Sequence, residues 1–156
     1  TMDMIDKKIL TELQKDATQN SSKLARKLNI PISTVHHRIK KLMSNKTIEK
    51  IQAKLSPERV GKPILAFIFV TFDYRNTTSK ILSQRDSAEI IGRFPEVQEI
   101  HVISGAFDML IKVRGKNNDE ISSFVIDKLR TVKGVDKATT MFVMATEKED
   151  ISLFIS

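Results

Sequence analysis

Hydrophobic positions change their spacing near residue 63. Before it, apolar residues recur every three or four positions in three short segments, which predicts helices over residues 5–13, 21–28 and 33–42. After it, strand-like and helix-like patterns alternate to the end of the chain. The sequence therefore predicts a helical N-terminal domain and a mixed C-terminal domain, so the chain as a whole falls in the α+β class.

The second and third predicted helices are expected to meet at a tight corner. Ser21 or Ser22 can cap the second helix, and Asn29 suits the left-handed turn position after it. Pro31 disfavours helical geometry at the residue before it, and Ser33 is the natural N-cap of the next helix. Two helices joined in this way are typical of a helix-turn-helix, whose second helix enters the DNA major groove.

The third helix is predicted to have a buried stripe and a polar face. Val35, Ile39 and Leu42 fall at i, i+4 and i+7 and form the stripe. The remaining positions offer side chains that can read bases or bind phosphate. From this helix and the start of the preceding one, we predict DNA contacts by Ser21, Ser22, Lys23, Ser33, Thr34, His36, His37, Arg38, Lys40 and Lys41.

Within this set, Ser33, Thr34 and His37 are expected to read bases, because recognition helices contact base edges near their N-termini. The basic residues of the third helix, and the start of the second helix, would instead hold phosphates. The alternative for Arg38 is an ion pair with an acid of the first helix such as Asp6 or Glu12, with the lysines merely solvated.

A linker is expected between the two domains. Residues 47–55 alternate imperfectly and could form a short strand or wing, and turn-forming residues from 56 to 63 then close the region. We therefore expect a three-helix helix-turn-helix domain, with or without a wing, over residues 1–50. A linker over 51–63 and a second domain over 64–156 would follow.

The second domain has six predicted elements. Strands are expected over 64–72, 97–103, 107–113 and 136–146, and helices over 79–94 and 119–132. The order strand, helix, strand, strand, helix, strand is that of a ferredoxin-like βαββαβ domain, in which two helices cover one face of an antiparallel sheet. Residues 151–156 could add an edge strand or an oligomer contact.

Charge separates the two predicted domains. Residues 1–63 hold 14 Lys and Arg against 6 Asp and Glu, whereas residues 64–156 hold 12 against 13. A basic half beside a neutral half indicates that only the first meets a polyanion such as nucleic acid. Chance clustering of lysine on solvated helix faces is the alternative.

Several classes of protein find no support in the sequence. The chain has no cysteine, no apolar run that approaches the roughly 20 residues of a membrane span, and no signal-peptide pattern, so we expect a cytoplasmic protein. His36 and His37 are adjacent, and adjacent side chains diverge by about 100° on a helix. They therefore do not predict a metal site, and no cofactor is expected.

Six short motifs keep a fixed order along the chain. They are residues 5–17, 24–30 and 33–42 in the first domain, and Phe94-Pro95-Glu96-Val97, Ser104-Gly105-Ala106-Phe107-Asp108 and Lys133-Gly134-Val135 in the second. Together they resemble the Lrp/AsnC family of prokaryotic transcriptional regulators. The resemblance implies a DNA-binding helix-turn-helix, a ferredoxin-like effector domain, and homodimers that assemble into tetramers or octamers.

In many members of that family an amino acid binds near the loop between the second and third strands. The matching residues, and thus the predicted effector site, are Gly105, Ala106, Phe107 and Asp108. The alternative is a tight turn in which Asp108 caps backbone N–H groups and no ligand binds. The family's usual glycine after the recognition helix is missing, and Asn45 is expected to take positive φ in its place.

The sequence thus predicts a sequence-specific regulator that binds double-stranded DNA as a dimer or larger oligomer. We expect an amino acid or related metabolite to modulate it, and we expect no enzymatic activity. One alternative is a metabolite-binding oligomeric scaffold with a vestigial DNA-binding helix. The other is an enzyme similar to a branch that decarboxylates tetrapyrroles, in which His101 would act with Arg93 or Arg114.

Overall fold

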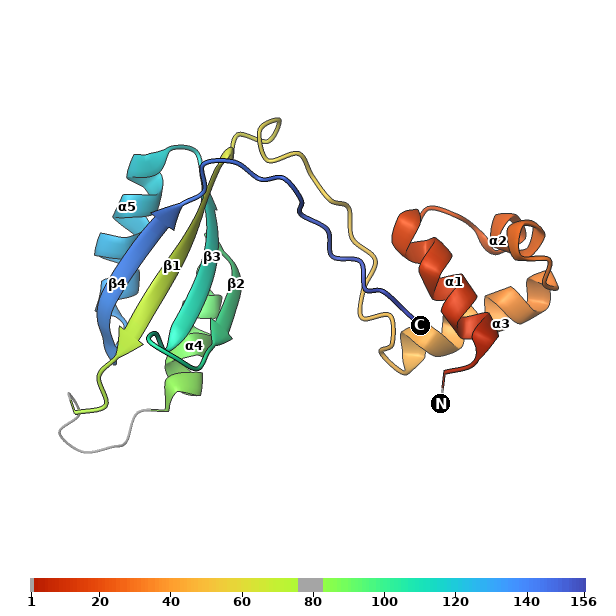
Figure 1. The fold of residues 1–156 in the computed structure, drawn as a ribbon, viewed down its shortest axis with the longest axis horizontal. Coiled ribbons are helices and arrows are strands. Elements are labelled where there is room, and N and C mark those ends of the chain that lie inside the picture. The colour runs from red at the N-terminus through yellow and green to blue at the C-terminus, as the bar shows by residue number, and fades with distance from the viewer. Residues whose placement is uncertain (1, 76–82) are drawn as a thin grey trace. The chain divides into compact units, whose positions relative to one another are not determined.

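The computed structural model describes residues 2–75 and 83–156, which form two compact units (Figure 1). The first unit contains the chain up to residue 54 together with residues 148–156, and the second contains residues 55–147. The sequence analysis assigned everything after residue 63 to the second domain. The last residues of the chain lie instead with the first unit, because Ile155 packs against its core.

The first unit is built from three helices, as the apolar spacing predicted. They are α1 (Met4–Lys15), α2 (Ser21–Leu28) and α3 (Ile32–Ser44). Their shared core is formed by Ile9, Leu10, Leu24, Val35 and Leu42, all of which are buried. Helices this short are marginal alone, so this apolar contact stabilises the unit.

The corner between α2 and α3 is the turn that the sequence predicted. Asn29 adopts the left-handed conformation with φ of 55°, and the Ile30 N–H donates to the carbonyl of Ala25. The predicted cap at the start of α2 is wrong. Asn20 caps it, because its side chain accepts from the Lys23 N–H at 2.8 Å.

The segment after α3 departs from the prediction in two ways. Lys46, with φ of 63°, takes the left-handed conformation that was expected of Asn45, whose side chain instead accepts from the Thr47 N–H. Residues 45–63 contain no strand, so the weak alternation over 47–55 forms no β-ladder. The predicted turn is present and is closed by a bond from the Lys62 N–H to the Pro57 carbonyl.

The second unit is a four-stranded antiparallel sheet in the order β2-β3-β1-β4, with two helices on one face (Figure 1). The elements are β1 (Ile64–Phe72), α4 (Gln84–Gly92), β2 (Val97–Val102), β3 (Met109–Gly115), α5 (Asn118–Asp127), a 3₁₀ turn η1 (Leu129–Thr131) and β4 (Val135–Phe142). This is the predicted ferredoxin-like order. The predicted helix over 79–94 begins partly outside the described residues.

The two faces of the sheet differ in what covers them. Ala66, Ile68 and Val70 of β1 are fully buried in the core beneath α4 and α5. Phe67 and Phe69 alternate with them and point to the opposite face, where Met141 lies directly across from Phe67. Met141 is 50% exposed, so this second face carries apolar side chains that the described residues leave partly uncovered.

Candidate nucleic-acid interface and effector loop

The candidate recognition helix α3 begins one residue earlier than predicted. Its N-cap is Pro31, which has no capping side chain, and the Val35 N–H donates to the Pro31 carbonyl at 3.1 Å. The assignment of Ser33 as N-cap is therefore wrong. Proline can open a helix because its φ is already close to the helical value. Ser33 is exposed in the first turn, and its hydroxyl has no partner among residues 2–75 and 83–156.

One side of α3 is buried and the other is exposed. Val35 and Leu42 are buried in the core, and Ile39 packs against it. Within residues 2–75 and 83–156, no hydrogen bond or ion pair engages the exposed side chains of Ser33, His36, His37, Lys40 and Lys41. Thr34 is half-buried. This face therefore offers uncommitted hydroxyl, imidazole and ammonium groups on one rigid helix, as base and phosphate contacts require.

Arg38 differs from its neighbours on α3 because it is engaged within the protein. Its guanidinium forms an ion pair with Asp3 and a second with Asp6 at 3.3 Å. Asp3 is also the N-cap of α1, and its pKa is lowered by the Asp6 backbone N–H and by Arg38. The pairing with Asp6 is the alternative that the sequence left open, and it holds α3 against the start of α1.

The start of α2 is a second polar feature of the first unit. Ser22 and Lys23 are exposed and Ser21 is half-buried. The positive end of a helix dipole and its unpaired N–H groups attract phosphate.

Glu12 fixes α2 against α1 because it forms ion pairs with Lys27 of α2 and with Lys15, and these two cations lower its pKa.

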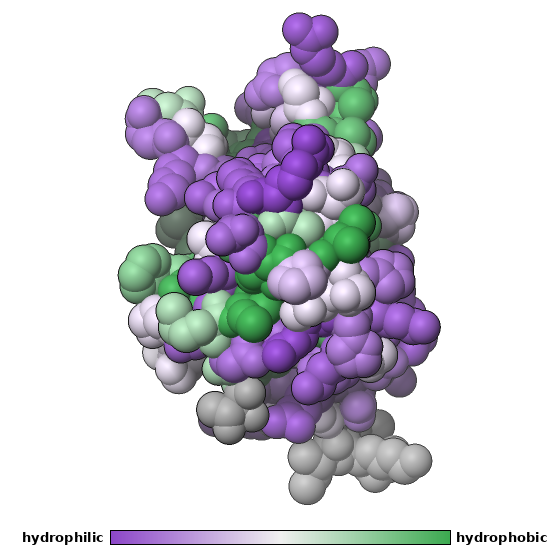
Figure 2. Space-filling view, turned by 90° about the vertical axis from the view of Figure 1, so that its right-hand side faces the viewer, coloured by the Kyte–Doolittle hydropathy of each residue, from purple (hydrophilic) through white to green (hydrophobic). Residues whose placement is uncertain are grey.

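Figure 2 shows one face of the molecule, on which hydrophilic residues surround a few hydrophobic ones. Lysine and arginine outnumber acids in residues 1–63, the part of the chain that contains α1, α2 and α3. The first unit therefore combines a positive charge excess with a helix-turn-helix. Sequence reasoning found each of these features, but it missed Asp3 as a partner of Arg38, because Asp3 lies just before α1 as its N-cap and the sequence analysis considered only acids within the first predicted helix.

The candidate effector loop connects β2 to β3. Gly105 has φ of 117°, which favours glycine, and a β-carbon there would meet nothing within 4 Å. The ring of Phe107 lies 5.0 Å from that of Phe69, on the uncovered face of the sheet. The loop thus presents backbone groups and one aromatic ring, while Gly105 and Ala106 are exposed.

Asp108 is committed to the fold of this loop. One carboxylate oxygen accepts from the Phe72 N–H at 2.7 Å, and the other accepts from the Gln84 side-chain amide at 3.2 Å. This is the capping role that the sequence left open as the alternative for Asp108. Gln84 also contacts the Tyr74 hydroxyl, so a network joins the loop to the end of β1 and the start of α4. Neither Gln84 nor Tyr74 carried a signal in the sequence.

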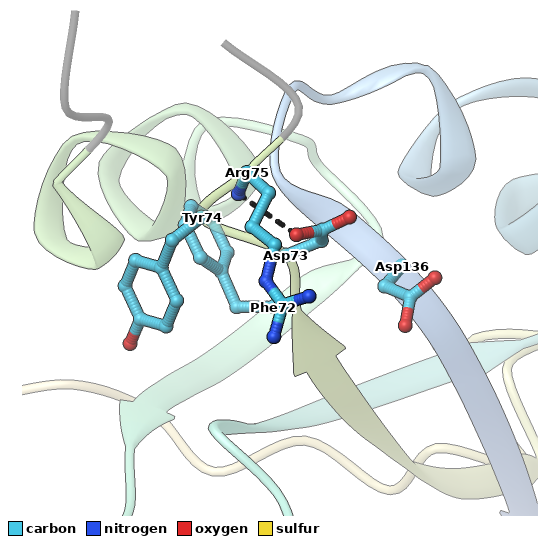
Figure 3. A pocket seen from close by; sticks show the side chains of 5 residues that line it. All are labelled: Phe72, Asp73, Tyr74, Arg75 and Asp136. Atoms are coloured by element: carbon cyan, nitrogen blue, oxygen red, sulfur yellow. Dashed lines mark hydrogen bonds between the residues drawn. The ribbon is translucent and has the colours of Figure 1, made fainter.

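A shallow pocket of about 340 Å³ lies at the end of β1 (Figure 3). It is lined by Phe72, Asp73, Tyr74, Arg75 and, from β4, Asp136. The Arg75 N–H donates to the Asp73 side chain, as the dashed line in Figure 3 marks. Charged groups of both signs surround this pocket, which the sequence analysis did not identify.

His101 and Arg93, which the sequence analysis considered for decarboxylation, each pair with a glutamate. His101 pairs with Glu99 at 3.0 Å, and Arg93 pairs with Glu89 one helical turn away. Among the described residues, no three His, Asp or Glu side chains are grouped so that they could hold a metal ion. No helix in the same part of the chain is both long and apolar enough to cross a membrane.

Comparisons with known proteins agree with both units. Residues 2–49 match the model of a winged helix-turn-helix DNA-binding domain, and residues 65–153 match that of the Lrp/AsnC ligand binding domain. An HTH-type transcriptional regulator of Pyrococcus horikoshii, PH1916, is 41% identical over 150 residues, which cover 96% of this chain and 97% of the relative. The HTH-type transcriptional regulator FL11 of Pyrococcus furiosus is 34% identical over 155 residues, 97% of this chain and 95% of its own.

Two solved structures share the fold along almost the whole chain. The transcriptional regulator NMB0573 of Neisseria meningitidis, in complex with L-Met, has a TM-score of 0.85 at 29% identity and covers 98% of this chain and 96% of its own. An AsnC family regulator of Agrobacterium tumefaciens has a TM-score of 0.87 at 26% identity, with 97% and 96% covered. The chain therefore belongs to the Lrp/AsnC family and is a metabolite-modulated, DNA-binding regulator of transcription.

Proposed function

We propose that the chain regulates transcription by inserting α3 into the major groove of a specific operator. The observation that carries this proposal is the exposed face of α3, whose polar side chains are uncommitted while Val35, Leu42 and Arg38 fix the helix to the rest of its unit. Ser33, Thr34 and His37 would read bases. Lys40 and Lys41, His36 beside them, and the start of α2 at Ser21, Ser22 and Lys23 would contact the phosphate backbone.

We further propose that the functional form is a homodimer that can assemble into tetramers or octamers. The uncovered sheet face, with Phe67, Phe69 and the half-exposed Met141, supports this because an unpartnered apolar surface favours association. A symmetric dimer places two recognition helices on one DNA site, which therefore has an approximately palindromic sequence. Such a protein acts in the cytoplasm, where prokaryotic DNA is found.

The proposed effector is an amino acid that binds at the loop from Gly105 to Asp108. NMB0573, the relative from Neisseria, was solved with L-Met, which supports this class of ligand. The exposed backbone N–H groups of Gly105 and Ala106 would donate to the carboxylate, and Phe107 would contact the side chain. Asp108 would hold the loop against the ends of β1 and α4, because its carboxylate accepts from the Phe72 N–H and the Gln84 amide.

Selection from a random pool of duplex DNA tests the DNA-binding proposal. We expect enrichment of one approximately palindromic motif, and gel shifts at two salt concentrations should show affinity that falls steeply as salt rises. Retention of all fragments with equal affinity would contradict sequence-specific regulation.

Thermal-shift assays with each common amino acid then test the effector, with a Gly105→Val variant as the control for binding at the loop.

A further inference from the structure

The C-terminal segment, residues 148–156, has no helix or strand, yet it is held on the first unit at defined points. The Gln14 side-chain amide donates to the Leu153 carbonyl at 2.9 Å, and its oxygen accepts from the Leu153 N–H at 2.6 Å. One side-chain amide thus pairs with both polar groups of one residue, as a neighbouring β-strand would. Gln14 therefore binds the backbone of the segment, so this contact does not depend on the identity of the side chain at position 153.

An apolar anchor lies two residues further along. Ile155 packs against the core of the first unit, whereas Leu153 and Phe154 are 75% and 97% exposed. Ile151 is also exposed. A segment that merely collapsed onto the surface would bury its largest apolar side chain, Phe154. Burial of Ile155 instead, together with the Gln14 bonds, indicates a specific docked register.

The outgoing linker is joined to the returning segment. The Lys54 ammonium group donates to the Glu149 carbonyl at 2.5 Å and lies 3.9 Å from the Glu149 carboxylate. Lys54 follows α3 and Glu149 follows β4, so the chain leaves the first unit and returns to it (Figure 1). The first unit is consequently connected to the second by two covalent segments rather than one.

We propose that residues 148–156 are a latch that restrains the DNA-binding unit and thereby strengthens binding to paired half-sites. This inference rests on the proposed function. A domain on one flexible linker samples a large volume, which lowers the effective concentration of the second recognition helix at the second half-site. The latch holds α1 through Gln14, and α1 holds α3 through the ion pairs of Arg38.

Two variants of the full-length chain test the latch. Gln14→Met removes both hydrogen bonds at an exposed helical position and keeps a good helix former, and Ile155→Asp removes the apolar anchor. Phe154→Ser is the matched control, because it alters the neighbouring side chain without touching either contact. Binding is measured on a duplex with the selected two-half-site operator and on one with a single half-site.

We expect both variants to bind the two-half-site duplex about tenfold or more weakly and the single half-site as the unaltered protein does. Amide exchange at Leu153 should be slow in the unaltered protein and in Phe154→Ser and fast in both test variants. Unchanged affinity for the paired site in both variants would overturn the latch. If the unaltered protein selected no operator, the proposed function would fail. If the Leu153 amide still exchanged slowly in both test variants, the docking of residues 148–156 on the first unit would be refuted.

Discussion

At the residue scale, the recognition helix contains basic residues with two different tasks. Lys40 and Lys41 are exposed and without partners in the described parts of the chain, whereas Arg38 is only 26% exposed and paired with two acids. A guanidinium can bridge two carboxylates because its donors lie in a fixed fork. The same helix therefore uses arginine for its own placement and leaves its lysines exposed, where the proposed function has them contact DNA.

Replacing Lys40 or Lys41 with alanine should weaken binding to all DNA sequences about equally. Each lysine that contacts a phosphate releases about one counterion, so the slope of log affinity against log salt should fall by about 1. Filter binding over a salt series measures this slope. Lys137→Ala, an exposed lysine on β4, should leave the slope unchanged, and an equal effect there would argue against a specific role for α3.

Replacing Arg38 with methionine should lower the melting temperature of the first unit. Asp6 is 7% exposed, and the loss of Arg38 leaves its carboxylate without a cation. Adding Asp6→Asn should recover part of the loss, because the amide carries no charge. Calorimetry of the two variants and of the combined variant checks this coupling, and simple additivity of the two changes would refute it.

At the element scale, α1 and α2 depend on Glu12. Its pKa is lowered by Lys27 first and then by Lys15, so the folded state binds this proton less readily than the unfolded chain. The resulting stabilisation is fully present above the ordinary pKa of 4.5 and is lost as the pH falls through the lowered value. Acid therefore loosens the contact between these two helices.

We expect the free energy of unfolding to fall below about pH 4.5 and to fall less steeply in a Glu12→Gln variant. Urea titrations from pH 7 down to pH 3 measure the difference between the two proteins. The Glu12→Gln variant should be less stable at pH 7 and should approach the unaltered protein at pH 3. A constant difference across this range would rule out titration of Glu12 as the cause.

The strands β1 and β4 meet closely at Gly134. Its φ is +91°, and a β-carbon there would lie 2.1 Å from the Phe72 ring. Gly134→Ala should therefore destabilise the second unit by about 3 kcal/mol, from the strained backbone and the overlap together. Gly61→Ala is the control, since φ is +77° but nothing lies within 4 Å. Urea denaturation should rank Gly61→Ala as the milder change.

At the scale of the whole molecule, the proposed dimer would link association to DNA binding through the exposed sheet face. A Met141→Glu substitution would place a charge opposite Phe67 on this face. We expect it to shift the protein toward monomer in analytical ultracentrifugation and to weaken binding to a two-half-site operator. Ile126→Glu, at an exposed position of α5, should leave the oligomer intact. If that variant dissociated instead, the interface would lie on the helical face rather than on the sheet face.

Local chemistry made most of the fold predictable. The apolar stripe of α3 and the continuous apolar run of β1 predicted both elements because burial depends on spacing. Asn29 predicted the corner because few residues tolerate positive φ. The errors came from ends and turns, where several residues compete. Pro31 rather than Ser33 precedes α3, Asn20 rather than a serine caps α2, and Lys46 rather than Asn45 takes the left-handed position.

The sequence by itself determined the helix-turn-helix, the βαββαβ order and the basic first domain, because periodicity and charge are written locally along the chain. Only the tertiary structure decided which polar groups are free. It paired Arg38 with Asp3, committed Asp108 to the Phe72 N–H, and brought Leu153 to Gln14 across 139 positions. Such contacts depend on how distant segments meet in space. A single sequence does not show which residues far apart along the chain come into contact.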